Sequence, residues 1–319
     1  KGQVVCSSSA INLFTPVIYG MKDYREAIKL IADLDEYGLD MFEFMGLMVF
    51  AKALAENGLI PRDRAEPKIE IESIASMEAW AEKIAHREGL GDVLADGFPG
   101  VIEAFGEKAE ALAPALVKGM HPYAGPGAAL PWHLFGTMEL GRVLDPRGPH
   151  VGSSGSPTYF ARRPLEVFPK HLDRMGVPED EIARLLPQGD EGEIAGLNVG
   201  GLLRHSHRWF AILGSLGVCA RAQINRFYSA SFCAGAYEAV TGIETPVSAL
   251  RERADRAWTL LRLANLREGF EREREEVLPR KWFGDRGFQD YVSEKPLTVE
   301  ETEHTIDDYY SQWDWDPKT

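Results

Sequence analysis

The sequence predicts a mainly α-helical protein. Apolar residues recur with the i, i+3, i+4 spacing of amphipathic helices through most of the chain. Segments that alternate apolar and polar residues are few, and no strand–helix–strand unit can be traced. Glycine, proline and Asn-Gly pairs separate the helical stretches, as helix stop signals do. We therefore expect two helical domains rather than a sheet-based fold.

The first helical stretch covers residues 21–57 and is interrupted in the middle. Gly38 is a residue type that favours the left-handed conformation just after a helix, and Asp40 is a preferred N-cap for the helix that follows. An Asn-Gly pair predicts the end of this second helix. Helical spacing predicts further helices over 77–87 and 101–112.

Residues 118–157 hold eight glycines and six prolines, so helices of normal length are not expected there. Long irregular segments in compact proteins are usually binding surfaces or disordered. The aromatic residues of this one, among them Trp132 and Phe135, favour an ordered region that lines a site. The change in composition predicts a first domain over 1–115 and a second over 116–319.

Helical spacing resumes in the second domain. Pro246 suits the first turn of a helix. The densely charged residues 268–280 predict a solvated segment. Thr298 and Glu301 form a capping pattern that predicts a last, acidic helix. The predicted helices of this domain cover 179–186, 197–214, 222–241, 246–270 and 298–315.

Composition restricts the class of protein. The 319 residues include 49 acidic and 35 basic ones, a net charge of −14, which repels phosphate backbones and argues against a nucleic-acid partner. No run of about 18 apolar residues predicts a membrane span. Cys6, Cys219 and Cys233 are too few and too far apart for a disulfide framework, so a reducing cytoplasm is the expected compartment.

Two short segments carry residue types that suit a cofactor. In the first, Asp35 and Asp40 lie on either side of a glycine turn, where carboxylates and helix-start amides can bind a polar heterocycle; helix capping explains the same residues. In the second, Gly217 and Val218 precede Cys219, whose thiolate can bind a metal or cluster. A buried structural cysteine is the alternative.

Together the two segments resemble the paired D-x-x-G-L-(C/D) motifs of the aldehyde:ferredoxin oxidoreductase superfamily of tungsten enzymes. Residues 35–40 match this pattern in full, whereas the second copy has Val218 for leucine and Gly214 in place of the acid. Other blocks in the same order also resemble the family, so the resemblance covers nearly the whole chain. It implies two helical domains that correspond to the family's domains 2 and 3. These further blocks are 87–97, 265–280 and 308–316.

The resemblance implies a tungsten bis-pterin cofactor (tungstopterin) and a 4Fe–4S cluster with Cys219 as its last ligand. The family's β-rich first domain is absent from this chain, as is the C-x-x-C-x-x-x-C run that supplies the other three cluster ligands. Both are expected in a segment upstream of Lys1 or in a partner chain. The implied pterin-binding residues are Asp35, Gly38, Leu39, Asp40, Gly217 and Val218.

Two further residues are candidates through the same resemblance. Aldehyde-oxidising members carry an acidic loop near the metal, where residues 13–17 of this chain have no acid. Cys6 lies upstream and resembles the cysteine with which class II benzoyl-CoA reductases, a branch of the superfamily, bind tungsten; a packed loop cysteine is the alternative. His150 is one residue away from the histidine of the family's Arg-Gly-x-x-His segment, where a histidine can transfer protons.

The activity implied by the resemblance is a low-potential two-electron reaction at an aldehyde or carboxylate, or at an aromatic acyl-CoA. Electrons would pass through the cluster to a ferredoxin or another iron–sulfur protein, and the enzyme would be active only with the missing N-terminal part. Cys6 and the absent acid favour the aromatic-ring (benzoyl-CoA type) branch. The rival interpretation is a cofactor-free helical scaffold derived from the family. The missing acid at Gly214 favours this interpretation, whereas the retained Cys219 argues against it.

Overall fold

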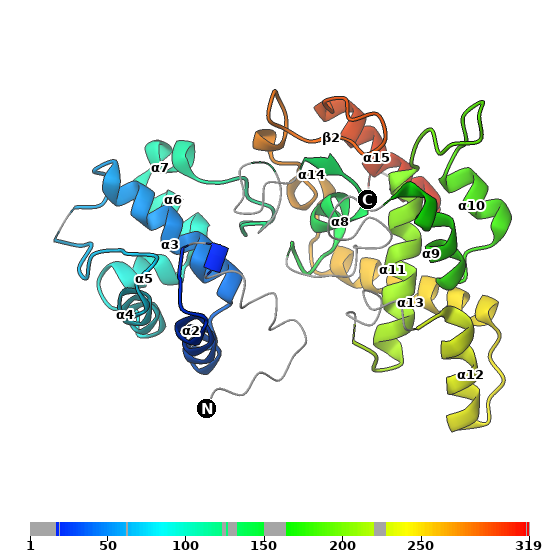
Figure 1. The fold of residues 1–319 in the computed structure, drawn as a ribbon, viewed down its shortest axis with the longest axis horizontal. Coiled ribbons are helices and arrows are strands. Elements are labelled where there is room, and N and C mark those ends of the chain that lie inside the picture. The colour runs from blue at the N-terminus through cyan, green and yellow to red at the C-terminus, as the bar shows by residue number, and fades with distance from the viewer. Residues whose placement is uncertain are drawn as a thin grey trace. The chain divides into compact units, whose positions relative to one another are not determined.

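The structure, a computed structural model, describes residues 17–18, 20–61, 63–122, 126, 133–149, 164–219, 228–316 and 318. Helices predominate in these ranges, which confirms the mainly α class (Figure 1). The chain divides into two compact units, Lys1–Pro131 and Trp132–Thr319, and residue 116, where a boundary was expected, lies inside the first unit. None of the helices in the described ranges is long and apolar enough to cross a membrane.

The first unit is built around a buried helix. α3 (Met41–Glu56) carries buried apolar side chains on nearly all sides, as the apolar sequence of this helix requires. Five more helices contribute to the same core, in which Trp80 and Phe98 are fully buried. They are α2 (Tyr24–Tyr37), α4 (Ile74–Ala85), α5 (Leu90–Ala95), α6 (Gly97–Phe105) and α7 (Glu107–Leu112).

Most predictions for this unit are confirmed, and one is wrong. The interrupted helix over 21–57 appears as α2 and α3. The single helix expected over 101–112 is instead split between α6 and α7 at Gly106, whose φ is +74°. The break turns the chain, so that Val101 and Ala109, on successive short helices, both reach the core.

The second unit is built around α11 (Val199–Ser215), in which nearly every residue from Gly200 to Phe210 is buried. α8 (Thr137–Leu144), α10 (Glu179–Leu185), α13 (Val247–Arg267) and α15 (Val299–Gln312) pack against it. The remaining elements are η2 (Leu165–Val167), α9 (Phe168–Arg174), α12 (Ala230–Thr241), α14 (Arg272–Glu275) and η4 (Arg280–Trp282), with β1 (Leu134–Phe135) paired in parallel with β2 (Gln289–Asp290).

In this unit, α10, α11, α13 and α15 lie where helices were predicted, and Thr298 and Glu301 form the predicted capping box. Two other expectations are wrong. The glycine- and proline-rich stretch contains α8, all eight residues of which are buried. The charged segment 268–280 is not solvated throughout, since Glu276 and Leu278 are buried. In both places tertiary contacts override local composition.

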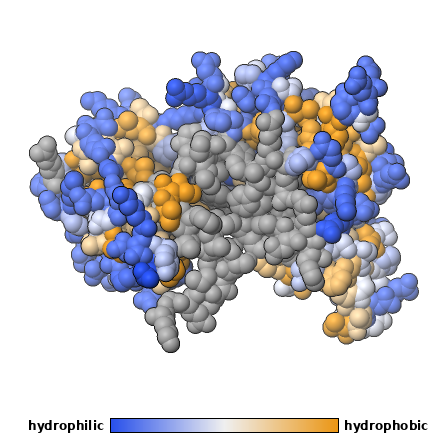
Figure 2. All heavy atoms as spheres, viewed as in Figure 1, coloured by the Kyte–Doolittle hydropathy of each residue, from blue (hydrophilic) through white to orange (hydrophobic). Residues whose placement is uncertain are grey.

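Apolar side chains are also exposed on α12. Phe232 and Val240 are 49% and 86% exposed, and Figure 2 shows hydrophobic residues over this helix at the lower right of the view. Cys233, on the same helix, is buried. Only 230–241 of the helix expected over 222–241 are helical among the described residues, and 222–227 lie outside them.

Candidate functional site

The first predicted motif forms the turn between α2 and α3. Gly38 takes the left-handed conformation with φ +70°, and its N–H donates to the Asp35 carbonyl at 3.2 Å. The Leu39 N–H donates to the Leu34 carbonyl at 2.9 Å. This pair of bonds is the Schellman arrangement at a helix end. Asp40 then caps α3, with its Oδ1 accepting from the Glu43 N–H at 2.9 Å.

The capping interpretation therefore holds for Gly38 and Asp40, but it does not extend to Asp35. The Asp35 side chain is exposed, and none of its carboxylate oxygens has a hydrogen-bond or ion-pair partner among the described residues. A carboxylate in this setting can accept hydrogen bonds from a ligand without giving up a structural contact.

The second motif has the same backbone as the first. Gly217 also has φ +70°, and its N–H donates to the Gly214 carbonyl at 3.1 Å, while the Val218 N–H donates to the Leu213 carbonyl at 2.8 Å. Leu213 is buried like Leu34 in the first turn, and Val218 is half-buried like Leu39. Each residue of the second turn follows its counterpart by 179 positions, so the sequence repeat is also a structural repeat.

The missing acid at Gly214 has no steric cause. Among the described residues, a Cβ atom built on Gly214 meets no atom within 4 Å apart from its chain neighbours and the backbone of its own helix. An aspartate side chain would therefore fit at this position, as Asp35 does in the first turn.

Cys219 occupies in the second turn the place of Asp40 in the first, and it is exposed. By contrast, burial raises the pKa of the Cys233 thiol in the core. Within the described ranges, His, Cys, Asp and Glu side chains form no group of three that could hold a metal ion. Further ligands for a cluster on Cys219 would have to come from elsewhere, as the sequence predicts. Cys6 lies outside the described residues.

His150 also lies outside the described residues, but the turn that leads to it is well defined. Asp145, at the end of α8, accepts hydrogen bonds from the Arg147 backbone N–H at 2.9 Å and from Arg147 Nε and Nη2 at 3.0 and 2.9 Å. The Asp145 side chain is 1% exposed, whereas that of Arg147 is 54% exposed. A buried carboxylate thus fixes the start of the segment that contains His150.

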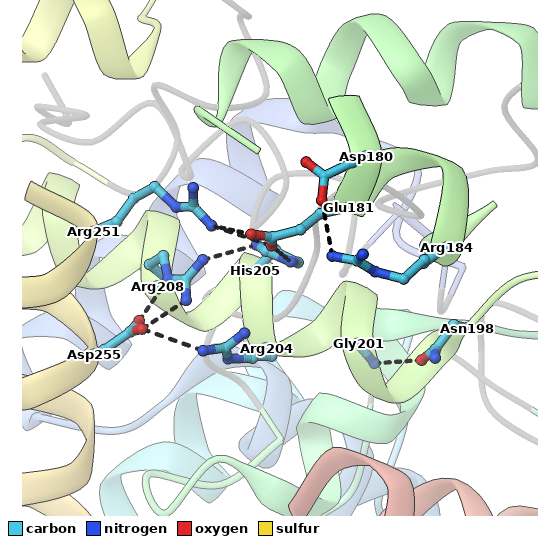
Figure 3. Close-up of polar contacts among 10 residues, drawn as sticks. All are labelled: Asp180, Glu181, Arg184, Asn198, Gly201, Arg204, His205, Arg208, Arg251 and Asp255. Atoms are coloured by element: carbon cyan, nitrogen blue, oxygen red, sulfur yellow. Dashed lines mark hydrogen bonds and ion pairs between the residues drawn. The ribbon is translucent and has the colours of Figure 1, made fainter. Parts of the chain in front are cut away.

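The sequence did not predict the polar network that holds α11, shown in Figure 3. His205 Nε2 lies 3.1 Å from the Glu181 carboxylate on α10, and Arg251 on α13 donates to the same carboxylate at 3.0 and 3.1 Å. Arg208 donates to both oxygens of Asp255 on α13 at 2.5 and 2.6 Å. The helix α11, which leads into the turn with Gly217 and Cys219, is therefore linked by charged contacts to two neighbours.

Histidine in this network is neutral. Burial lowers the pKa of His205 to about 4, against the opposing effect of Glu181. Hydrogen bonds from His205 and Arg251 hold the pKa of Glu181 below its usual range. His205 Nε2 therefore donates to the carboxylate, while its Nδ1 accepts from Arg208 at 3.1 Å. His205 and His207 on this helix contact different residues, Glu181 and Tyr309.

A second acid lies beside the first turn. Burial raises the pKa of Glu43 to about 7; the His121 N–H, 3.2 Å from Oε2, opposes this shift, and the neighbouring charge of Asp40 adds to it. The folded protein therefore keeps a proton on Glu43 at pH values at which the unfolded chain has lost it.

A pH-dependent stability follows from Glu43. Between pH 4.5 and about 7 the folded state binds the extra proton, so the free energy of unfolding falls as the pH rises through this window, by up to about 3 kcal/mol. Glu43→Gln should remove this slope and make the variant more stable than the parent at pH 8. Urea unfolding at pH 5 and pH 8 measures the difference. Exposed Glu36→Gln is the matched control, and an unchanged slope in Glu43→Gln would contradict the prediction.

The helical fold and the repeated turn define a class of protein, and the comparisons with known proteins agree. The family model "Aldehyde ferredoxin oxidoreductase, domains 2 & 3" matches residues 8–319. The chain belongs to the aldehyde ferredoxin oxidoreductase family and comprises these two domains, as the resemblance implied.

Curated relatives and solved structures are similar to the chain. A tungsten-containing aldehyde ferredoxin oxidoreductase of Pyrococcus horikoshii is 34% identical over 90 residues, 27% of this chain and 15% of that protein. The enzyme of the same name from Pyrococcus furiosus is 24% identical over 266 residues, 82% of this chain and 38% of that protein. The chain thus spans well under half the length of these relatives.

One similar solved structure is the active-site complex BamBC of benzoyl-coenzyme A reductase in complex with 1,5-dienoyl-CoA. Its TM-score is 0.71 at 21% identity, and the match covers 95% of this chain and 46% of that one. At this identity the likeness establishes the fold, which is that of the two helical domains.

Proposed function

We propose that this chain is the C-terminal part of a tungsten bis-pterin, iron–sulfur oxidoreductase. Its reaction is a low-potential two-electron conversion of an aldehyde or carboxylate, or of an aromatic acyl-CoA, and it requires the N-terminal part of the enzyme. The observation that carries the proposal is the repeated turn, because two copies of one backbone arrangement suit a cofactor with two similar halves.

The residues of the turns fit such a cofactor chemically. Pterin rings present N–H donors, and the exposed Asp35 carboxylate, without a partner in the described part of the chain, can accept from them. The glycines at 38 and 217 leave the outside of each turn open, since a Cβ on either would meet nothing of the described residues beyond its chain neighbours within 4 Å. When bound, the cofactor supplies the redox chemistry, and the protein binds and orients it.

The exposure of Cys219 supports its proposed role as the last cluster ligand. The other three thiolates would come from the N-terminal part, and a ferredoxin or iron–sulfur subunit would exchange electrons with the cluster. The names of the relatives support aldehydes as substrates. Cys6 and the absence of an acid at 13–17 favour the aromatic acyl-CoA branch, with Cys6 as a tungsten ligand and His150 as a proton donor or acceptor.

Asp35→Asn is the sharpest test of the pterin-binding role, because Asp35 makes no capping contact. We expect tungsten and pterin content of the purified full-length protein to fall several-fold, with an unchanged free energy of unfolding. Asp40→Ala should lower the cofactor content too, but it should also cost about 1 kcal/mol of stability through the lost cap. Elemental analysis, pterin fluorescence after oxidation and urea unfolding give the three quantities.

Glu36→Gln is the matched control, since Glu36 is an exposed acid next to Asp35 and occupies a variable position of the motif. It should leave tungsten and pterin unchanged. Equal tungsten content in Asp35→Asn and parent would refute the pterin assignment. A parent protein with neither tungsten nor pterin would instead favour the cofactor-free scaffold, in line with the missing acid at Gly214.

A further inference from the structure

The two sides of α13 have different surroundings. Arg251 and Asp255 extend from its inward side to Glu181 on α10 and Arg208 on α11 (Figure 3). The same side carries a row of buried residues at intervals of four, as a helix packed along one side requires. These are Leu250, Ala254, Trp258 and Arg262. The contacts of α13 with α10 and α11 therefore use one side of the helix.

The opposite side of α13 is exposed and follows a heptad pattern. Its exposed residues recur at alternating intervals of three and four, which places them on one line along the helix. This spacing is that of the residues that face a partner helix in a coiled coil. Leu260 and Leu263, in the middle of the line, are 56% and 55% exposed. We call this line the α13 seam; it consists of Arg253, Arg256, Leu260, Leu263 and Arg267.

The arginines of the seam make few contacts among the described residues. Arg256 has no hydrogen-bond or ion-pair partner there, and Arg253 Nη1 lies 3.5 Å from the Thr245 hydroxyl. Arg267 donates to its exposed neighbour Glu268 at 3.0 and 3.1 Å, a surface pair of little energetic weight. A basic and apolar stripe thus crosses the surface of a chain whose net charge is −14.

We propose that the α13 seam binds an acidic amphipathic helix of a partner protein. Apolar side chains of that helix would contact Leu260 and Leu263, and its carboxylates would pair with Arg253 and Arg256 at one end of the seam and with Arg267 at the other. Fourteen helical steps separate the two ends, so the seam is about 21 Å long and accommodates about four turns of a partner helix.

The charges of the seam favour this occupant over a second copy of the chain. A parallel pair of seams would place each arginine beside its own copy, and an antiparallel pair centred on Leu260 would place Arg253 opposite Arg267 twice. Like charges that face each other across an interface oppose association. An anionic membrane is also a poorer fit, because the exposed Glu252 and Glu268 lie beside the seam and the whole chain is acidic.

A synthetic peptide tests the charge and the apolar contact together. The probe is a fluorescein-labelled helical peptide of three heptads, with leucine at the central seam positions and glutamate at the outer ones. Fluorescence anisotropy should show that it binds the full-length protein, more weakly as salt is added. A peptide with lysine in place of glutamate should not bind. Arg253→Glu with Arg256→Glu should weaken binding by about tenfold or more, as should Leu260→Ala with Leu263→Ala.

The matched control is Arg184→Glu with Arg274→Glu, which makes the same charge change at exposed arginines outside the seam. It should leave the affinity for the peptide within about twofold of the parent value. All these positions are exposed, so the variants are expected to fold like the parent. An acidic peptide that does not bind the parent, or that binds the seam variant and the control equally, would overturn the proposal.

Cross-linking identifies the occupant in the complete enzyme. A benzophenone amino acid in place of Leu260 should cross-link to an acidic helical segment of another protein. Cross-links to a second copy or to another part of the same chain would overturn the proposal, as would binding of phosphatidylserine vesicles that the two arginine-to-glutamate changes in the seam abolish. None of these measurements requires tungsten or pterin, so the inference and the proposed function can fail separately.

Discussion

Replacing Cys219 by serine is expected to eliminate the proposed 4Fe–4S cluster, lowering iron from about four atoms per chain to less than about one. A thiolate binds iron of a cluster far better than a serine hydroxyl does. The cost in stability should be small, because the side chain is exposed and the turn before it is held by the backbone bond from Val218 to Leu213. Iron and sulfide analysis of the complete enzyme, with electron paramagnetic resonance of the reduced form, measures the cluster.

Cys233→Ala is the control for this experiment. Cys233 is buried in α12, so its truncation should lower the free energy of unfolding by about 1 kcal/mol and leave iron unchanged. Full iron content in Cys219→Ser would show that Cys219 is not a ligand. Equal loss of iron in both variants would point to general destabilisation rather than to ligation.

The features that the sequence predicted well are those determined by local interactions. Gly38 and Asp40 specify a helix end and a helix start by themselves, because the left-handed conformation and the capping bond involve residues at most five positions apart. The capping box of Thr298 and Glu301 is local in the same way. The repeated turn could therefore be predicted at 35–40 and at 214–219, although its role in cofactor binding came from resemblance.

The features that the sequence did not predict depend on contacts between distant segments. α8 lies in a glycine- and proline-rich stretch, and only its burial against α11 explains why this short segment is helical. Likewise, no spacing rule relates Glu181 to Arg251 or His207 to Tyr309, which are 70 and 102 residues apart. The high charge density of residues 268–280 did not predict that Glu276 is buried and paired with Arg262.

The buried ion pair of Glu276 with Arg262 leads to the largest expected effect on stability. Glu276 and Arg262 are 8% and 9% exposed, and Arg262 Nη1 lies 3.0 Å from Glu276 Oε1. The Tyr310 hydroxyl donates to the other carboxylate oxygen at 2.6 Å; burial, with the Glu276 charge next in importance, raises the pKa of Tyr310, so it remains a donor. Glu276→Ala would remove the carboxylate from both groups.

We expect Glu276→Ala to lower the free energy of unfolding by about 3–5 kcal/mol, because it leaves the Arg262 guanidinium buried without its counter-charge. The double variant Arg262→Met, Glu276→Leu should cost much less, since it leaves no buried charge behind. Exposed Glu273→Ala, in the same segment, should stay within about 0.5 kcal/mol of the parent. Urea unfolding of the parent and the three variants measures the four free energies of unfolding. If Glu276→Ala were no more destabilising than Glu273→Ala, segment 268–280 would be solvated after all, and the buried pair would not contribute to the fold.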